Sequence, residues 1–139
     1  MGFRNQSSGA SHKEKEIPCQ DFHIYEDLGD GWNVFIISDG AGSARESHRG
    51  SRMTCNLMVR AIRKLLEKSQ WKLQQDLPSD IDWYIEFSNI CRGIKGMIEE
   101  QIETLDEPVS SKDFNATIQV LIVSPNGMLV VISVTVEWD

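Results

Sequence analysis

The chain has 139 residues, of which 40% are apolar and 25% charged, and its formal net charge is −7. This length predicts one domain over residues 1–139, and the apolar content is sufficient for a core. The acidic balance argues against nucleic acid or an anionic membrane as the main partner, because both attract basic patches. No apolar run is long enough to span a bilayer. Three widely spaced cysteines give no disulfide framework, which favours a reducing cytoplasm.

The first predicted unit is a β-hairpin. Residues Gln20 to Tyr25 alternate between polar and apolar, as in a half-buried strand. Gly29-Asp30-Gly31 predicts the turn, and Trp32 to Ser38 predicts the return strand. Because the first strand enters the hairpin where the second leaves it, we expect Asp21 and Asp39 to meet at one end of the sheet.

A loop of small residues follows the second strand. Asp39 ends the apolar run, and Gly40-Ala41-Gly42-Ser43-Ala44 comes after it. A carboxylate at the end of a buried strand needs a partner, and a hard divalent cation is one candidate. One alternative is that Asp39 caps the next helix or opens a turn, as Asp-Gly commonly does. Another is that Gly40 and Gly42 form a nucleotide-phosphate loop, although no complete phosphate-loop pattern is present.

Two amphipathic helices are predicted next. The first begins near Ser43 or Ser47 and ends near Lys68, and the second opens at the capping sequence Ser79-Asp80-Ile81-Asp82. Each carries an apolar stripe at helical spacing. The stripes are Met53, Leu57, Met58, Ala61, Ile62, Leu65 and Leu66, and then Trp83, Phe87, Ile90, Ile94, Met97, Ile98, Ile102 and Leu105. Gly93 and Gly96 weaken the second helix and would allow another helix to pack closely. The basic residues of the first helix are expected to form a solvated face: Arg60, Arg63, Lys64 and Lys68.

Two apolar strands are predicted after the helices, over Phe114 to Val123 and Met128 to Val136. Ser124-Pro125-Asn126-Gly127 predicts a tight turn between them. Strands, then two helices, then strands indicate an α+β fold with antiparallel pairing rather than a βαβ wind. Exposed apolar edges also predict self-association through the edge strands.

Four strings of residues resemble the N-terminal half of a PPM-type, metal-dependent protein serine/threonine phosphatase. The loop Ser38-Asp39-Gly40-Ala41-Gly42-Ser43-Ala44 is similar to the DGAGSA loop of the family's bacterial branch. The other strings are Gly9-Ala10-Ser11-His12, Ile17-Pro18-Cys19-Gln20-Asp21 and Asp113-Phe114-Asn115-Ala116-Thr117-Ile118. In the last of these, a small residue and a threonine open a core strand, as in the family.

The resemblance implies a partial αββα sandwich, in which antiparallel sheets lie face to face with helix pairs outside. It implies two Mg²⁺ or Mn²⁺ ions and hydrolysis of phosphoserine or phosphothreonine proteins by a metal-activated water. By position, Asp39 would bridge both metals and the Gly40 carbonyl would ligate one. Gln20 falls where many members have a ligating Glu, and Asp21 would hold a metal-bound water.

Several positions depart from the family pattern. Gln20 is neutral, which weakens its metal site. Ala41 stands where many members have a His thought to act as general acid, and Glu16 has the spacing of a phosphate-binding Arg. The candidate replacements are His12 or His48 as proton donor and Arg45 or Arg49 as phosphate contact.

The segment Val130 to Asp139 lacks the family's GDG segment and its later aspartates. The resemblance therefore predicts a truncated phosphatase domain, for which a frameshift near Ser133 is one explanation. Two functions stay open at this point. One is metal-dependent phosphomonoester hydrolysis, and the other is a non-catalytic pseudophosphatase or phosphoprotein-binding module.

Overall fold

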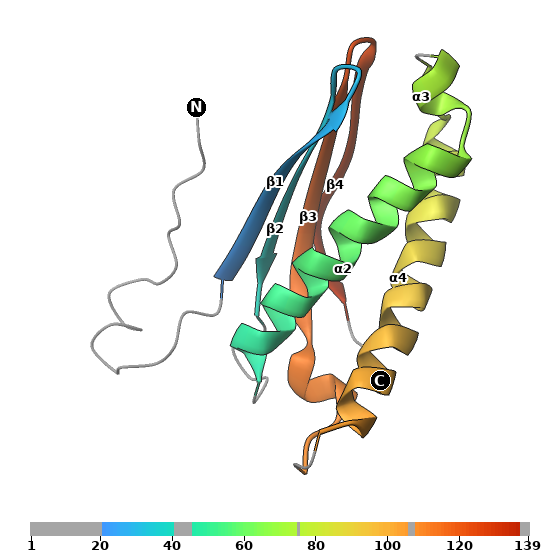
Figure 1. The fold of residues 1–139 in the computed structure, drawn as a ribbon. Helices are drawn as coiled ribbons and strands as arrows, with labels where there is room; N and C mark the ends of the chain where they lie inside the picture. Colours follow the sequence, from blue (N-terminus) through green and yellow to red (C-terminus); the bar gives the residue numbers. More distant parts are fainter. Residues whose placement is uncertain (1–20, 41–45, 75, 106–107, 137–139) are drawn as a thin grey trace, which may run out of the picture.

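A four-stranded antiparallel sheet with helices on one face forms the fold (Figure 1). The computed structural model describes residues 21–40, 46–74, 76–105 and 108–136. The strands lie in the order β1–β2–β3–β4. Their bounds are β1 Asp21–Gly29, β2 Trp32–Asp39, β3 Ala116–Ser124 and β4 Gly127–Val136. The helices are α2 Ser47–Lys68, α3 Trp71–Gln74, α4 Asp80–Glu103 and the 3-10 helix η1 Ser111–Phe114.

Side-chain alternation along the strands separates a buried face from an open one. In β2, Trp32, Val34 and Ile36 are fully buried, whereas the intervening Phe35 and Ile37 are only half-buried. The helices cover the first set, because successive side chains of a strand point to opposite faces. The sequence pattern of β2 therefore fixes which face of the sheet receives the helices.

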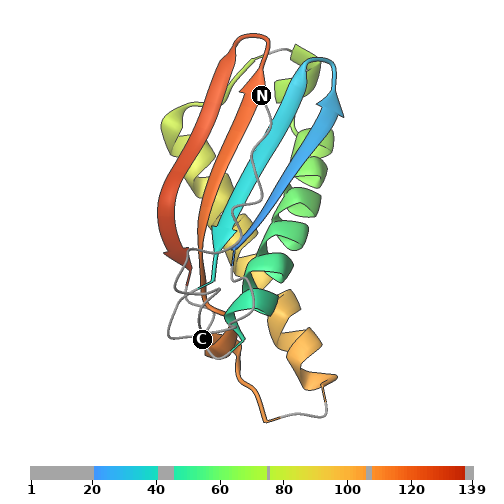
Figure 2. The same cartoon turned by 90° about the vertical axis from the view of Figure 1, so that its left-hand side faces the viewer.

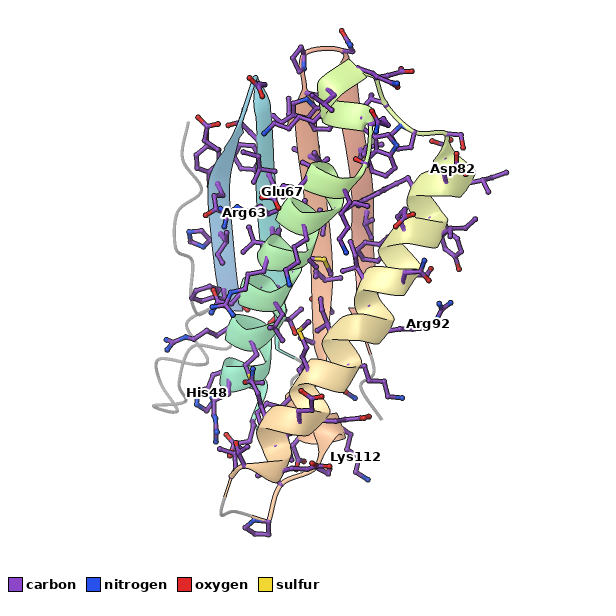
Figure 3. The ribbon with its side chains drawn as sticks, turned by 45° about the vertical axis from the view of Figure 1, so that its right-hand side comes forward. His48, Arg63, Glu67, Asp82, Arg92 and Lys112 are labelled. Atoms are coloured by element: carbon purple, nitrogen blue, oxygen red, sulfur yellow. The ribbon has the colours of Figure 1, made fainter. Side chains whose placement is uncertain are left out.

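Helix α2 lies across β1, β2 and β3, and α4 packs beside α2 (Figures 1 and 3). Helix α4 contributes four buried side chains to the core, Trp83, Phe87, Ile94 and Ile98. The Trp83 indole Nε1 also donates a hydrogen bond of 3.4 Å to the Val130 carbonyl, which ties α4 to β4. On the other side, Arg63 of α2 forms an ion pair with Glu26 of β1. Both helices are thus attached to the sheet as well as to each other.

The second face of the sheet is not covered by any described element, as the face-on view in Figure 2 shows. The strand register places Tyr25, Phe35, Leu121 and Val130 in one row across this face. Tyr25 and Phe35 are in ring contact at 4.7 Å between centroids, and Tyr25 donates a hydrogen bond to Asn33 Oδ1. A row of apolar side chains therefore crosses the open face of the sheet.

The predicted α+β fold, both hairpins and both long helices are confirmed. The Ser79 cap is also confirmed, since its hydroxyl accepts a hydrogen bond from the Asp82 N–H. The expected strand start at Phe114 is wrong, because Ser110 and Asp113 form a capping box that holds Phe114 in η1. Within the predicted connector, the short helix α3 was not expected. None of the helices in the described part of the chain is long and apolar enough to cross a membrane.

Two expectations for α4 are also wrong. A Cβ added at Gly93 or Gly96 would meet no atom within 4 Å, so neither glycine serves close packing with another helix. Met97, expected in the core, is 42% exposed. The apolar stripe predicted for α4 therefore includes a residue that the fold leaves exposed.

Candidate active site at one end of the sheet

Two carboxylates lie side by side where β1 begins and β2 ends. Asp21 and Asp39 are directly opposite each other in the antiparallel register, as predicted. Opposed residues of this kind have Cβ atoms roughly 5 Å apart. Because Ser38 is buried beneath the helices, Asp39 projects from the open face of the sheet. The pair is thus reachable from solvent, with Asp21 half-buried and Asp39 exposed.

The proximity of the two groups changes the acidity of one of them. Partial burial raises the pKa of Asp21 to about 7, and a hydrogen bond to Asp39 and the Asp39 charge contribute further to the rise. Burial disfavours the charged form of Asp21, and the neighbouring Asp39 carboxylate disfavours it further, because two adjacent carboxylates resist ionising together.

Hydroxyl groups connect the end of β2 to the start of β3. The Asp39 N–H donates to Thr117 Oγ1 and the Thr117 hydroxyl donates to the Asp39 carbonyl, both at 3.2 Å. Ser38 Oγ donates to the Thr117 carbonyl at 2.8 Å. Gly40 then pairs with Ala116 in an isolated antiparallel bridge. Three consecutive residues, Ser38, Asp39 and Gly40, are therefore bonded to the first residues of β3.

The start of α2 is docked closely against the segment that leads into β3. The Glu46 N–H donates to the Asp113 carbonyl at 2.8 Å, and the Arg49 guanidinium lies 5.5 Å from the centre of the Phe114 ring. A Cβ at Gly50 would lie only 2.3 Å from the Phe114 carbonyl oxygen. Glycine is thus required at this position, since any larger residue would push α2 away from η1.

The structure decides one of the alternatives for Asp39, whereas the turn and the phosphate loop involve residues 41–45, which lie outside the described residues. The residue before α2 is Glu46, so Asp39 does not cap this helix. Asp39 is the last residue of β2 and Gly40 follows in the bridge to β3. The spacing of residues in the sequence did not predict the hydrogen bonds of Ser38 and Thr117. Both residues nevertheless belong to the sequence strings that resemble the phosphatase family.

Of the other predicted site residues, only His48 and Arg49 lie in the described part of the chain. His12, Gln20, Ala41 and Arg45 lie outside the described residues. His48 is exposed in the first turn of α2 (Figure 3), and Arg49 is 3.7 Å from Glu46. Among the described residues, no group of three or more His, Cys, Asp or Glu side chains could hold a metal.

Comparison with family models decides the relationship. The model of the family "Protein phosphatase 2C" matches residues 8–134, which include both carboxylates and all described strands except the end of β4. The chain belongs to the protein phosphatase 2C family. Searches of curated proteins and of solved structures gave no match. The resemblance seen in the sequence is therefore confirmed at the level of the family.

The protein phosphatase 2C family gives a context for the acidic pair at the end of this sheet. The family is generally metal-dependent, and protein phosphatases act on phosphoproteins. Two adjacent carboxylates are also the oxygen donors that Mg²⁺ and Mn²⁺ prefer. The roles of Asp21, Asp39 and Gly40 as metal ligands remain predictions, as do the bacterial branch and the truncation.

Proposed function

We propose that this chain is a metal-dependent phosphatase-type hydrolase that uses the Asp21–Asp39 pair to bind a divalent cation and act on phosphoserine or phosphothreonine proteins. The observation that carries the proposal is the direct opposition of these two carboxylates in a chain of the protein phosphatase 2C family. Asp39 and Asp21 are the residues assigned to the reaction, with His12 as the candidate proton donor.

The donor set fits one hard cation. Two carboxylates with a hydrogen bond between them present oxygen ligands from neighbouring strands, and a cation between them would neutralise their negative charge. The Gly40 carbonyl and the Gln20 amide are further candidate oxygens. A bound divalent cation would supply electrostatic stabilisation of the phosphoryl group. With so few protein ligands we expect dissociation constants in the roughly micromolar-to-millimolar range.

Calorimetry with Mn²⁺ on the wild type and on Asp39→Ala tests the metal site. We expect weak saturable binding by the wild type and none by the variant. Asp82→Ala is the matched control, because it removes an exposed carboxylate that lies in α4 rather than on either strand of the pair. Equal Mn²⁺ binding by the wild type and Asp39→Ala would remove Asp39 from the site.

Release of phosphate from a phosphoserine peptide tests the reaction itself. We expect release by the wild type that requires Mg²⁺ or Mn²⁺ and is abolished in Asp39→Asn. Metal binding without release would favour the second candidate, a non-catalytic module that binds phosphoproteins.

We also propose that residues 1–139 form one domain. The protein would work in the cytoplasm and would self-associate. The described strands and helices share one hydrophobic core, and both described cysteines are free thiols. Self-association would use the edge strands β1 and β4, together with the apolar row on the open face. Sedimentation equilibrium tests this, since a folded monomer at high concentration would contradict it.

A further inference from the structure

A groove of about 340 Å³ lies between α2 and α4, on the opposite side of the sheet from the acidic pair. Its lining residues span Leu57 to Lys68 on one helix and Glu86 to Met97 on the other. At 1.5 Å per residue each wall is roughly 16 Å long, which matches about three turns of a helix. The groove therefore has the length of a short helical segment.

The walls are apolar at the base. Leu57, Ala61 and Leu65 line the α2 side, and Ile90 and Met97 line the α4 side. Leu65 and Ile90 are half-buried, and Met97 is 42% exposed. Leu65 and Ile90 pack against the core on one side and remain partly accessible on the other. A partner that buries them would gain hydrophobic stabilisation.

One rim of the groove is basic. Arg60, Lys64 and Lys68 are exposed and follow one another at four-residue spacing along α2, so they form a row. Within the described part of the chain, no carboxylate lies in ion-pair distance of any of the three. Arg63 differs, because it is engaged by Glu26 on the far side of the helix. A positive row in a chain of net charge −7 is a local exception that favours an acidic partner.

Gly93 lies between the lining residues Ile90 and Met97 of α4 and carries no side chain. Gly93 comes seven residues after Glu86, three after Ile90 and four before Met97, so all four residues lie on the same face of α4. A Cβ there would meet nothing within 4 Å. Glycine inside a helix costs about 1 kcal/mol relative to alanine. The fold gains no packing at Gly93 in return, so a larger residue there would extend freely from the face of α4 that carries the lining residues Ile90 and Met97.

We propose that this groove binds an acidic amphipathic helix of a partner protein. Apolar side chains of that helix at three- and four-residue spacing would fill the base, as in other helix-in-groove complexes. Its Asp or Glu residues would face Arg60, Lys64 and Lys68. The docking surface is separate from the acidic pair, so its occupation does not depend on the proposed phosphatase activity.

Fluorescence anisotropy with a labelled synthetic peptide tests the proposal on the full chain. The probe is a helix of about 14 residues, with leucines at i, i+3, i+4 and i+7 and glutamates elsewhere. A second probe has lysines in place of the glutamates. We expect saturable binding of the acidic probe, weakened by salt, and no binding of the basic one. Absence of saturable binding of the acidic probe would overturn the proposal.

Two pairs of variants locate the binding. The double charge reversal R60E/K64E should weaken binding of the acidic probe roughly tenfold. The charge reversal K112E, in η1, should not weaken it (Figure 3). Gly93→Leu should also weaken it roughly tenfold by filling the groove, whereas Gly93→Ala should retain binding. Circular dichroism checks that each variant is folded. Equal affinity within either pair would overturn the assignment. Binding of wild type to phosphatidylserine vesicles but not to the peptide would replace it by a membrane contact.

Discussion

Replacing Asp39 by Asn should lower the pKa of its neighbour Asp21 in the metal-free protein. Partial burial is the largest cause of the raised Asp21 pKa, and the hydrogen bond to Asp39 and the Asp39 charge follow. The substitution removes the charge and keeps the side-chain volume. The Asp21 pKa should therefore fall from about 7 toward its usual value of 3.8 without reaching it, because burial remains.

The magnitude follows from linkage between protonation and folding. The folded state keeps the Asp21 proton up to about pH 7, whereas the unfolded chain releases it near 3.8. Stability from this group therefore falls as pH rises between these two values. At about 1.4 kcal/mol per pKa unit, the ceiling is roughly 4 kcal/mol. Exposure of the pair to solvent reduces this, and we expect about 1–2 kcal/mol.

Chemical denaturation of the wild type and Asp39→Asn at pH 5 and pH 8 measures the effect. The wild type should lose about 1–2 kcal/mol between these pH values, and the variant should lose less than the wild type. At pH 8 the variant should be the more stable of the two without metal, because the repulsion is gone. Carbon-13 NMR titration of the Asp21 carboxyl group reports the pKa directly. A titration near pH 4 in both proteins, or an equal pH dependence of unfolding, would refute the reasoning.

Three further substitutions test the packing and capping described above, each by denaturant unfolding. Gly50→Ala should destabilise the protein by about 3 kcal/mol, because its Cβ would collide with the Phe114 carbonyl; an unchanged midpoint would show that α2 can move away from η1. Ser79→Ala should cost about 1 kcal/mol, since the Asp82 N–H loses its acceptor, while Ser79→Asp should retain the stability. Gly96→Ala should stabilise the protein by about 1 kcal/mol, because the added methyl group meets no atom; destabilisation would mean that the space is filled.

The local features of the fold were predictable because they depend on neighbouring residues. The Gly29-Asp30-Gly31 turn needs positive φ angles, which all three residues adopt, with Asp30 at 55°. The alternation in β2 and the serine cap of α4 are similarly local. The opposition of Asp21 and Asp39 followed from the hairpin alone, because a turn of fixed length sets the register of both strands.

The features that sequence reasoning missed depend on contacts between distant segments. Phe114 has a strand-like sequence, but a capping box four residues long holds it in η1. The two glycines of α4 were expected to receive a neighbouring helix, and only the positions of α2 and α4 show that they face open space. The bonds between Thr117 and Asp39 join residues 78 positions apart, which no local pattern can reveal.

The core and the acidic pair are coupled through the register of β2. Trp32, Val34 and Ile36 must all face the helices, because they are fully buried. A shift of one residue would expose all three and turn Asp39 toward the helices, where its charge would have no partner. The hydrophobic free energy that holds the helices on the sheet thus also holds Asp39 on the open face beside Asp21. If the proposed metal site at the sheet end exists, substitutions that loosen the core beneath β2 should therefore weaken it even though they touch neither carboxylate.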